Sequence, residues 1–556
     1  METDSGDIEK SAERNTDNGL PAMSKLPENR ALAWLGRDRR WIDLLILLLA
    51  AVFRLWALDL KPAHFDEGVN GYFVDEITRN GVYHYDPTNF HGPLHFYILF
   101  VMETLFGRGV WILRLPLALA GIGCVALLLT GFRRYFSPAA CRFAALAMAI
   151  SPGFVFYSRY AIHETWLVLL LMGLALGIGG LWREGTKRNL WVIGASLAGA
   201  FTIKETWIIH VIAMVLAGLT LRGLELISKS SPALWAASRW TLDDGAHVAS
   251  ICLAFILFFF TGCLLDLAGV GGFVEAFTQW TRTGVSGTGH EKSPLYWWEL
   301  LTRYEWPVLA GVLASVAVIR PNTDRFLRWF AISAGGAFAA YSIIAYKTPW
   351  CLIAWAWPFF LVFGVAVDWL MRRFGRIVAG TIAGALLLVS LVQSWALNFY
   401  RFTDEDEPYV YVQTTNDVNE LLDPLRWQLA RNPAALFNPG HVIQPEHHPL
   451  LWLLGDRPNV TLEDEYGDPE PMDADWLLVD ENITERIEGK LRQSYFRTPV
   501  QIRGMSEYRS VLYLNEAVFA EFFAGREPEF QPEERKLLQE LPTPEAPEKA
   551  EMEDKQ

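Results

Sequence analysis

The chain has 556 residues, of which 52 % are hydrophobic, and the apolar residues concentrate in long runs between Trp41 and Tyr400. A soluble globular core does not show apolar runs of this length. The formal net charge of -14 arises largely at the two ends, and no basic patch with interleaved aromatic residues appears outside short turns, which excludes nucleic acid as an expected partner.

Eleven apolar segments are predicted to span a membrane as helices. A helix needs ~20 apolar residues to cross ~30 Å of hydrocarbon. The first segment is expected to be retained as a span, because its apolar run is long and forty polar residues precede it. The predicted spans are 41–60, 111–131, 139–157, 161–182, 190–203, 206–222, 246–266, 304–320, 328–346, 350–370 and 375–397.

Basic residues predict the orientation of these spans. Alternate loops, counted from the N-terminus, each hold three basic residues, such as Arg133, Arg134 and Arg142, whereas the other loops are longer in total and hold fewer. Basic loops stay in the cytoplasm, so a cytoplasmic N-terminus in a multi-pass protein of the cell (inner) membrane is expected. The apolar stretch 94–106 is too short to cross and is expected to lie at the outer interface or re-enter.

The predicted fold is an all-α polytopic membrane domain followed by a small extracytoplasmic α/β domain. Short strands are expected at 409–413 and 476–479, and a helix at 417–430. The predicted domains are a cytoplasmic polar tail at 1–40, the membrane domain at 41–398, the α/β domain at 399–525 and a disordered acidic tail at 526–556. The catalytic outer loops are expected at 61–110, 157–164, 267–303 and 346–350.

Two acids open the first outer loop. Asp66 and Glu67 follow the first predicted span within several residues, close to the lipid headgroups, where a lipid-linked phosphate would lie. Both are candidate catalytic carboxylates. Alternatively, Asp66 is the N-cap of an interfacial helix at 67–80 that ends at Asn80 and Gly81, and the two roles can coexist.

Aromatic and imidazole side chains follow these acids. Sugar sites use such groups for stacking and hydrogen bonding, whereas the alternative is that they anchor the chain at the membrane interface. The candidate substrate-binding residues are Tyr83, His84, Tyr85, Asp86 and His91, with His163 in the second outer loop.

The second outer loop is short and lies between two predicted spans. Charged groups so close to hydrocarbon are candidate functional residues. Arg159 is expected to bind a phosphate through two parallel hydrogen bonds, and Glu164 is a third candidate catalytic carboxylate that would orient His163, the acceptor or a metal ion. The alternative is a structural ion pair between Arg159 and Glu164.

Further basic residues lie on the predicted outer side, where the bias of Lys and Arg toward the cytoplasm leads us to expect few. Lys204, in a tight turn, and Lys347, at the head of a span, are predicted to bind the donor phosphate. The alternatives are that Glu205 neutralises Lys204 and that Lys347 only extends to the interface. His290 and Lys292, in the Gly-rich segment 284–294, are expected to meet the phosphate in a loop that closes over substrate, with a plain flexible loop as the alternative.

In this order the motifs resemble the glycosyltransferase C-type (GT-C) superfamily, in its dolichyl-phosphate-mannose protein-mannosyltransferase-like branch. Further motifs are similar to the flippase-activity-associated protein family of archaeal-type N-glycosylation, over about 40–410. The first resemblance rests on Asp66-Glu67, His91-Gly92-Pro93-Leu94 and Ser158-Arg159 with Glu164, and the second on 83–87, 91–94, 289–292 and 346–350.

The resemblance implies a membrane glycosyltransferase that moves a sugar, with inversion, from a polyprenyl-phosphate carrier to an acceptor lipid, protein or glycan on the extracytoplasmic face. Asp66 would be the general base, and cations would stabilise the departing phosphate. No cofactor is required by this chemistry, and a divalent metal ion is compatible with it. The family name also carries an alternative, a non-catalytic protein that binds a lipid-linked sugar in the membrane and assists its flipping.

Overall fold

The computed structural model describes residues 40–228, 238–283, 289–321, 323–464, 472–504 and 509–532. This part of the chain divides into two compact units. The membrane unit holds residues 40–58 and 82–401, and the sheet unit holds residues 59–81 and 402–532. The predicted first outer loop, 61–110, is therefore divided between the two units after Gly81. Most of both predicted tails, 1–39 and 533–556, lies outside the described residues.

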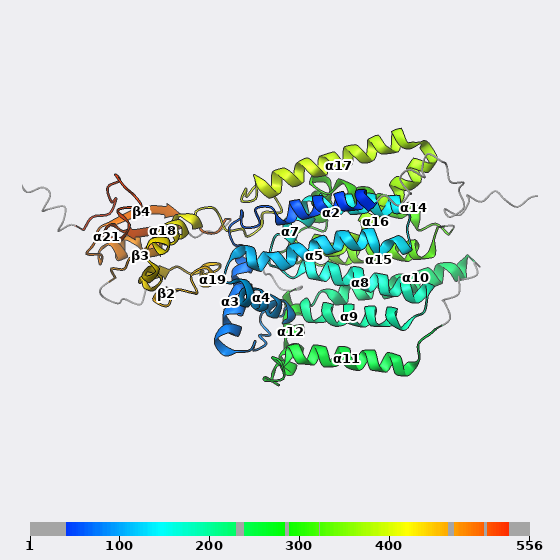
Figure 1. The fold of residues 1–556 in the computed structure, drawn as a ribbon, viewed down its shortest axis with the longest axis horizontal. Coiled ribbons are helices and arrows are strands. Elements are labelled where there is room, and N and C mark those ends of the chain that lie inside the picture. Colours follow the sequence, from blue (N-terminus) through cyan, green and yellow to red (C-terminus); the bar gives the residue numbers. More distant parts are fainter. Residues whose placement is uncertain are drawn as a thin grey trace, which may run out of the picture. The chain divides into compact units, whose positions relative to one another are not determined.

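The membrane unit consists of helices, and the longer ones run side by side (Figure 1). Its helices are α2 (Arg40–Leu55), α4 (Leu94–Phe106), α5 (Val110–Thr130), α6 (Pro138–Ala149), α7 (Pro152–Ser158), α8 (Glu164–Arg183), α9 (Lys187–Ile203), α10 (Trp207–Ile227), α11 (Leu242–Phe260), α12 (Gly269–Thr283), α13 (Tyr296–Arg303), α14 (Trp306–Val318), α15 (Arg325–Ile343), α16 (Cys351–Phe374) and α17 (Arg376–Phe399), with a short 3₁₀ turn η1 (Phe132–Arg134).

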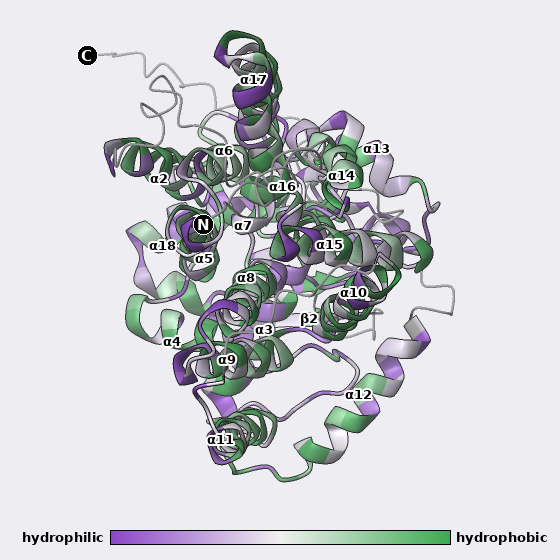
Figure 2. Ribbon diagram, turned by 90° about the vertical axis from the view of Figure 1, so that its right-hand side faces the viewer, coloured by the Kyte–Doolittle hydropathy of each residue, from purple (hydrophilic) through white to green (hydrophobic). Residues whose placement is uncertain are grey.

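Six of the described helices are long and apolar enough to cross a membrane, and α6 with α7, bent by 61°, makes a seventh candidate. In α16, 94 % of the most apolar window is buried, but in α11 only 6 % is. Apolar residues cover the exposed α11 and α17 (Figure 2). Helices with apolar residues on their outer faces need a lipid environment, so the chain is a multi-pass membrane protein.

Each predicted span overlaps a described helix, with the bent pair of α6 and α7 at 139–157. The number eleven stays a prediction, because α2, α9, α14 and α15 are not among the helices that meet both the length and the hydropathy criteria. The predicted non-spanning stretch 94–106 forms α4, a helix of 13 residues.

A buried carboxylate stabilises the bend between α6 and α7. Ser151 is the N-cap of α7, and its hydroxyl donates to Glu305 Oε2 at 2.7 Å. The backbone N–H of Gly153 donates to Glu305 Oε1 at 2.8 Å. The first N–H groups of a helix lack intrahelical partners, so this carboxylate satisfies the start of α7 inside the unit. The bend fixes where the loop after α7 begins.

The sheet unit contains five strands in the order β2-β1-β3-β5-β4. The strand β1 (Gly440–Ile443) is parallel to β2 (Val460–Glu463) and β3 (Trp476–Asp480), whereas β5 (Ser510–Asn515) is antiparallel to β3 and β4 (Tyr495–Val500). One face of the sheet packs on α18 (Val418–Arg431), through residues such as Leu421 and Leu478. The remaining short elements are η2 (Pro433–Phe437), α19 (Leu450–Leu453), η3 (Glu481–Ile483), α20 (Thr484–Glu488) and α21 (Glu516–Phe519).

The strand predicted at 476–479 and the helix predicted at 417–430 correspond to β3 and α18. The strand predicted at 409–413 is wrong, because Val412 has a φ of 55° and interrupts an extended backbone. This segment instead contacts residues 59–81. The carbonyl of Tyr411 bonds the His64 ring at 2.9 Å, and the Gln413 side chain donates to the Pro62 carbonyl at 3.2 Å.

The helix α3 (Phe65–Asn80) packs closely against α19 through two glycines. A Cβ on Gly68 would lie 2.4 Å from Pro449 Cα, and a Cβ on Gly71 would lie 2.3 Å from Trp452 Cγ. The helix ends at Gly81, whose φ of 78° suits glycine. This packing holds the predicted interfacial helix within the sheet unit.

Substitution of Gly71 by Ala should therefore destabilise the sheet unit by about 1–3 kcal/mol, because the new methyl group overlaps a buried tryptophan ring. Thermal unfolding of the purified full-length protein measures this change. Gly335→Ala in α15 is the control, since nothing lies within 4 Å of its added Cβ. An unchanged melting temperature for Gly71→Ala would contradict the packing described.

Candidate active site

Two of the predicted acids lie at the start of α3. His64 is the N-cap, and its Nδ1 accepts a hydrogen bond from the backbone of Asp66 at 3.0 Å. Glu67 Oε2 accepts from the backbone of His64 at 2.8 Å, which completes a capping box. The alternative that Asp66 caps the helix is wrong, because the helix begins one residue before it and His64 supplies the cap.

The two acids differ in their availability. Glu67 is 1 % exposed and is bound to the cap. The Asp66 side chain is 36 % exposed, and its one ion-pair contact within the described residues is His64 Nδ1 at 3.9 Å. Of these two acids, Asp66 therefore has the more accessible carboxylate.

Six polar side chains lie close together in the membrane unit. They come from the segment before α4, from α4 itself, from the loop before α8 and the first residue of α8, and from the turn between α9 and α10. Lys204 Nζ lies 2.8 Å from Glu164 Oε1, with both side chains buried. His91 Nδ1 lies 2.8 Å from Glu205 Oε2. We call this group the charged cluster; it consists of His91, His95, His163, Glu164, Lys204 and Glu205.

These contacts correct two expectations. Glu164 pairs with Lys204, so the predicted alternative of an Arg159–Glu164 pair is wrong. Glu205 bonds His91, so the carboxylate in direct contact with Lys204 comes from the second outer loop and not from its sequence neighbour.

Burial and neighbouring charges shift the pKa values of residues in the charged cluster. Burial alone would lower the pKa of Lys204, but the carboxylates of Glu164 and Glu205 raise this pKa above its ordinary value. Burial opposes the ionised form of Glu205, but His91 and Lys204 lower its pKa. Burial and the neighbouring imidazoles lower the pKa of His163 well below its usual value, and burial lowers that of His95 to about 3. At neutral pH Lys204 is charged and both these imidazoles are neutral.

The three imidazoles are stacked. The His163 ring lies 4.1 Å from the His95 ring and 4.5 Å from the His91 ring, measured between centroids. His95 Nε2 donates to the Ala161 carbonyl at 3.2 Å, while His163 Nε2 and His95 Nδ1 have no partner within the described part of the chain. In that part no three His, Cys, Asp or Glu residues are placed to hold a metal ion, and metal dependence stays an untested prediction.

Arg159 lies elsewhere. Its guanidinium is fully buried and donates to the carbonyls of Phe53, Trp56 and Ala57, with the first two at 3.0 and 2.8 Å. These carbonyls lie at and after the end of α2, where helical carbonyls lack partners. The contacts favour a structural role over the predicted phosphate contact. Arg54 caps α6 in the same way, through the carbonyls of Met148 and Ala149, and sequence reasoning missed it.

The loop before α13 is joined to the head of α16. The backbone of Lys292 donates to the Ala345 carbonyl at 3.1 Å, and that of Lys347 donates to the His290 carbonyl at 3.0 Å. Lys347 Nζ donates to the Lys292 carbonyl at 3.2 Å. Burial lowers the pKa of both lysines. The predicted closing loop includes residues 284–288, which lie outside the described residues.

The predicted sugar-binding residues of the first loop separate. Tyr83 is buried against Phe96, with ring centroids 4.9 Å apart. His84 Nδ1 bonds Asp266 at 2.8 Å on the surface, and Asp86 accepts hydrogen bonds from Thr88 within a turn. These contacts give three of the five candidates structural partners, whereas Tyr85 lines a cavity and His91 joins the charged cluster.

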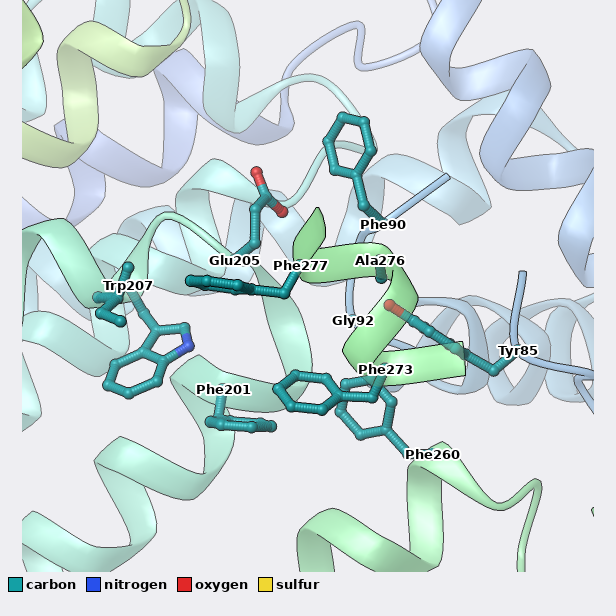
Figure 3. Close-up of a pocket in the computed structure, with 11 residues that line it drawn as sticks. Tyr85, Phe90, Gly92, Phe201, Glu205, Trp207, Phe260, Phe273, Ala276 and Phe277 are labelled. Atoms are coloured by element: carbon teal, nitrogen blue, oxygen red, sulfur yellow. The ribbon is translucent and has the colours of Figure 1, made fainter. Parts of the chain in front are cut away.

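That cavity has a volume of about 130 Å³ and an aromatic lining (Figure 3). Glu205 lies in its wall and connects it to the charged cluster. Sequence reasoning missed the lining, because aromatic residues in apolar helices look like ordinary core or lipid-facing residues. The lining residues are Tyr85, Phe90, Gly92, Phe201, Glu205, Trp207, Ile208, Phe260, Phe273, Ala276 and Phe277.

The fold is shared with two solved structures. The crystal structure of ArnT from Cupriavidus metallidurans bound to undecaprenyl phosphate matches with a TM-score of 0.56 and 17 % identity, over 86 % of this chain and 98 % of that chain. The Archaeoglobus fulgidus oligosaccharyltransferase matches with a TM-score of 0.50 and 12 % identity, over 87 % and 74 %. These similarities agree with the polytopic helical fold that the sequence predicts.

At the level of sequence, residues 90–242 match the family described as dolichyl-phosphate-mannose-protein mannosyltransferase. Two proposed mannosyltransferases of Bacillus subtilis, YycA and YkcB, are 32 % and 30 % identical over 173 and 172 residues, which is 29 % of this chain in each case. The matched part covers 24 % and 23 % of these proteins, so the chain spans about a quarter of the length of the curated relatives it matches. Residues 90–242 include the whole charged cluster.

Proposed function

We propose that the chain is a membrane glycosyltransferase that moves a sugar, with inversion, from polyprenyl phosphate to an acceptor lipid, protein or glycan. The observation that carries the proposal is the partly exposed carboxylate of Asp66, which its helix does not use as a cap. The similarity of residues 90–242 to mannosyltransferases and the undecaprenyl phosphate bound by the Cupriavidus protein support a polyprenyl-linked donor. The finer similarity to flippase-activity-associated proteins stays a prediction.

In the proposed reaction, Asp66 removes the proton from an acceptor hydroxyl. The hydroxyl oxygen attacks the anomeric carbon from the side opposite the phosphate, and the bond from that carbon to the phosphate oxygen breaks. The electron pair leaves with the polyprenyl phosphate, so the configuration inverts. Glu67 and Glu164 are weaker candidates for the base, because one belongs to the capping box and the other is paired with Lys204.

Cations stabilise the departing phosphate in this proposal. Lys204 is charged and lies beside two carboxylates, and Lys292 lies in the loop next to α16. Arg159 and Lys347 donate to backbone carbonyls and Lys204 is paired with Glu164, so we rank these three after Lys292; His290 remains a further candidate. The reaction requires no cofactor, since polyprenyl phosphate is a stable leaving group.

We further propose eleven spans in the cell membrane, a cytoplasmic N-terminus and an extracytoplasmic sheet unit of α/β type. The positions of basic residues support the orientation. Arg133 and Arg142 are bound to Asp43 at 2.6 and 2.8 Å, and Arg325 is bound to Glu225 at 2.6 Å. All three arginines lie at the proposed cytoplasmic ends of helices, where basic residues concentrate.

Lipid analysis of a deletion strain tests the proposed function. A single polyprenyl-phosphate sugar should accumulate, because its consumer is missing. Purified protein in nanodiscs should release polyprenyl phosphate from that same lipid. Binding of the lipid without release would support the alternative, a non-catalytic protein that assists flipping, and would overturn the proposal.

A further inference from the structure

The proposed reaction assigns no role to the aromatic cavity beside the charged cluster. Seven of its eleven described lining residues are aromatic, and they come from the segment before α4 and from α9, α10, α11 and α12. The Phe201 ring lies 4.9 Å from the Phe273 ring and 5.4 Å from the Trp207 ring, measured between centroids. The Phe260 and Phe273 rings are 5.1 Å apart. These rings surround one common space with Glu205 at its edge (Figure 3).

Glu205 supplies a negative charge to this aromatic wall. Its Oε2 lies 2.8 Å from His91 Nδ1, and because an ionised carboxylate only accepts hydrogen bonds, the imidazole is the donor. Burial raises the pKa of Glu205, but His91 and Lys204 lower it below its ordinary value, so the carboxylate is ionised at neutral pH. Lys204 makes its ion pair with Glu164. The cavity therefore borders an ionised carboxylate that is held in place by an imidazole.

Aromatic faces and a carboxylate attract the same kind of ligand. The face of an aromatic ring carries partial negative charge, and a cation within about 6 Å of the ring centre is attracted to it. An organic ammonium group also has carbon atoms that pack on the rings. A cavity of roughly 150 Å³ holds a benzene molecule. The volume here, about 130 Å³, therefore has room for an ammonium group with its neighbouring carbon atoms.

Two other kinds of occupant fit this wall less well. A hydrocarbon chain would leave the ionised Glu205 facing an apolar group, which costs free energy. A sugar can stack on the rings, but its hydroxyl groups each need a hydrogen-bond partner. Among the described lining residues, polar side-chain atoms come only from Tyr85, Glu205 and Trp207. The wall thus favours a cation over a hydrocarbon chain or a sugar.

The cavity lies at helix ends and next to the surrounding lipid. Phe201 is in the last turn of α9, Trp207 is the first residue of α10 and Phe260 is the last residue of α11. Both α11 and α12 lie at the edge of the membrane unit (Figure 2), and Phe277 of α12 lines the cavity while 43 % exposed. In the proposed orientation these helix ends face the outer headgroup layer, where the ammonium groups of phospholipids lie.

We propose that this cavity binds the ammonium group of a phospholipid headgroup, with the aromatic faces around the cation and Glu205 as its counter-ion. The inference goes beyond the proposed function and does not depend on sugar transfer. Phosphatidylethanolamine carries such a group. Acetylation of its amine removes the positive charge and leaves the phosphate and the acyl chains unchanged, which gives a matched ligand without the cation.

Native mass spectrometry of the purified full-length protein tests the inference. The protein in detergent is titrated with phosphatidylethanolamine and with its N-acetylated form, both with the same acyl chains. The measured quantity is the ratio of the two dissociation constants, which we call the lipid preference. The wild type should bind phosphatidylethanolamine roughly tenfold more tightly than the acetylated lipid.

Two variants locate the binding site. Glu205→Gln keeps the size of the side chain and an acceptor for His91 but removes the counter-ion, so the lipid preference should fall to within about twofold of unity. Phe277→Leu removes one aromatic face at an exposed position and should lower the lipid preference roughly two- to fivefold. Phe255→Leu in α11, at a residue that is 38 % exposed and outside the described lining, is the matched control and should keep the wild-type preference.

Equal binding of the two lipids by the wild type would overturn the inference. A preference that persists in both Glu205→Gln and Phe277→Leu would overturn it as well, because the ammonium group would then bind elsewhere. Equal weakening of both lipids by Phe277→Leu would assign the cavity to an acyl chain and contradict the proposal. The lipid preference compares two ligands on the same protein, so a smaller yield of folded variant does not alter it, and Phe277→Leu decides the question if Glu205→Gln does not fold.

Discussion

Replacement of Asp66 by Asn should lower sugar transfer by roughly 10²-fold or more, while the protein remains folded and inserted. Asn has the size of Asp but cannot take a proton from the acceptor hydroxyl. The cap of α3 comes from His64 and Glu67, so the substitution removes no cap hydrogen bond. The measurement is release of polyprenyl phosphate by purified, monodisperse protein, with the melting temperature recorded in parallel.

Glu67→Gln is the matched control, because it makes the same carboxylate-to-amide change one residue further on. A glutamine at this position can still accept the hydrogen bond from the His64 backbone, so transfer should stay within a few-fold of wild type. Asp66→Asn should also keep its affinity for the carrier lipid if the protein is an enzyme. Near-normal transfer by Asp66→Asn would sink the assignment and leave Glu67 or Glu164 as the next candidates.

Replacement of Lys204 by Met should destabilise the membrane unit by about 3–5 kcal/mol, because it leaves the buried carboxylate of Glu164 without its partner. Met keeps the apolar stem of Lys, so the loss comes from the charge and not from a cavity. Thermal or denaturant unfolding of the full-length protein in nanodiscs measures the effect.

Two further variants make this prediction specific. Lys187→Met removes an exposed lysine that pairs with Asp244 at 2.8 Å, and it should change the melting temperature little or not at all. The double variant Lys204→Met with Glu164→Leu removes both buried charges and should recover much of the lost stability. Equal effects of Lys204→Met and Lys187→Met would show that the buried pair contributes no more than an exposed one.

The helices of the membrane unit could be predicted from sequence because apolar runs of this length have few alternatives. The stretch predicted at 94–106 became α4 with the same bounds, set by Pro93 before it and by Gly107, whose φ is 86°, after it. The strands β1, β2, β4 and β5 were not predicted. They are short, and parallel pairs such as Gly440 with Val460 depend on contacts between distant segments that no local pattern reveals.

In the candidate site, the sequence identified which loops carry charge but not which charges meet. Lys204 and Glu205 are adjacent in sequence, yet they face different partners, Glu164 and His91. Side-chain direction at the end of α9 decides this, and adjacency in sequence does not specify it. Arg159 shows the same limit, since a buried guanidinium that caps a helix and one that binds phosphate give the same sequence signal.

The sheet unit combines residues 59–81 with residues from 402 onward, so the ribosome makes its two parts at different times. Roughly 320 residues separate Gly81 from Phe402, so at about 5–20 residues per second α3 is made some tens of seconds before the first sheet residue. During that interval Gly68 and Gly71 have no α19 to pack against. A nascent chain that stalls after α17 would have made the described helices of the membrane unit but not α19, so α3 would still lack the partner against which its two glycines pack.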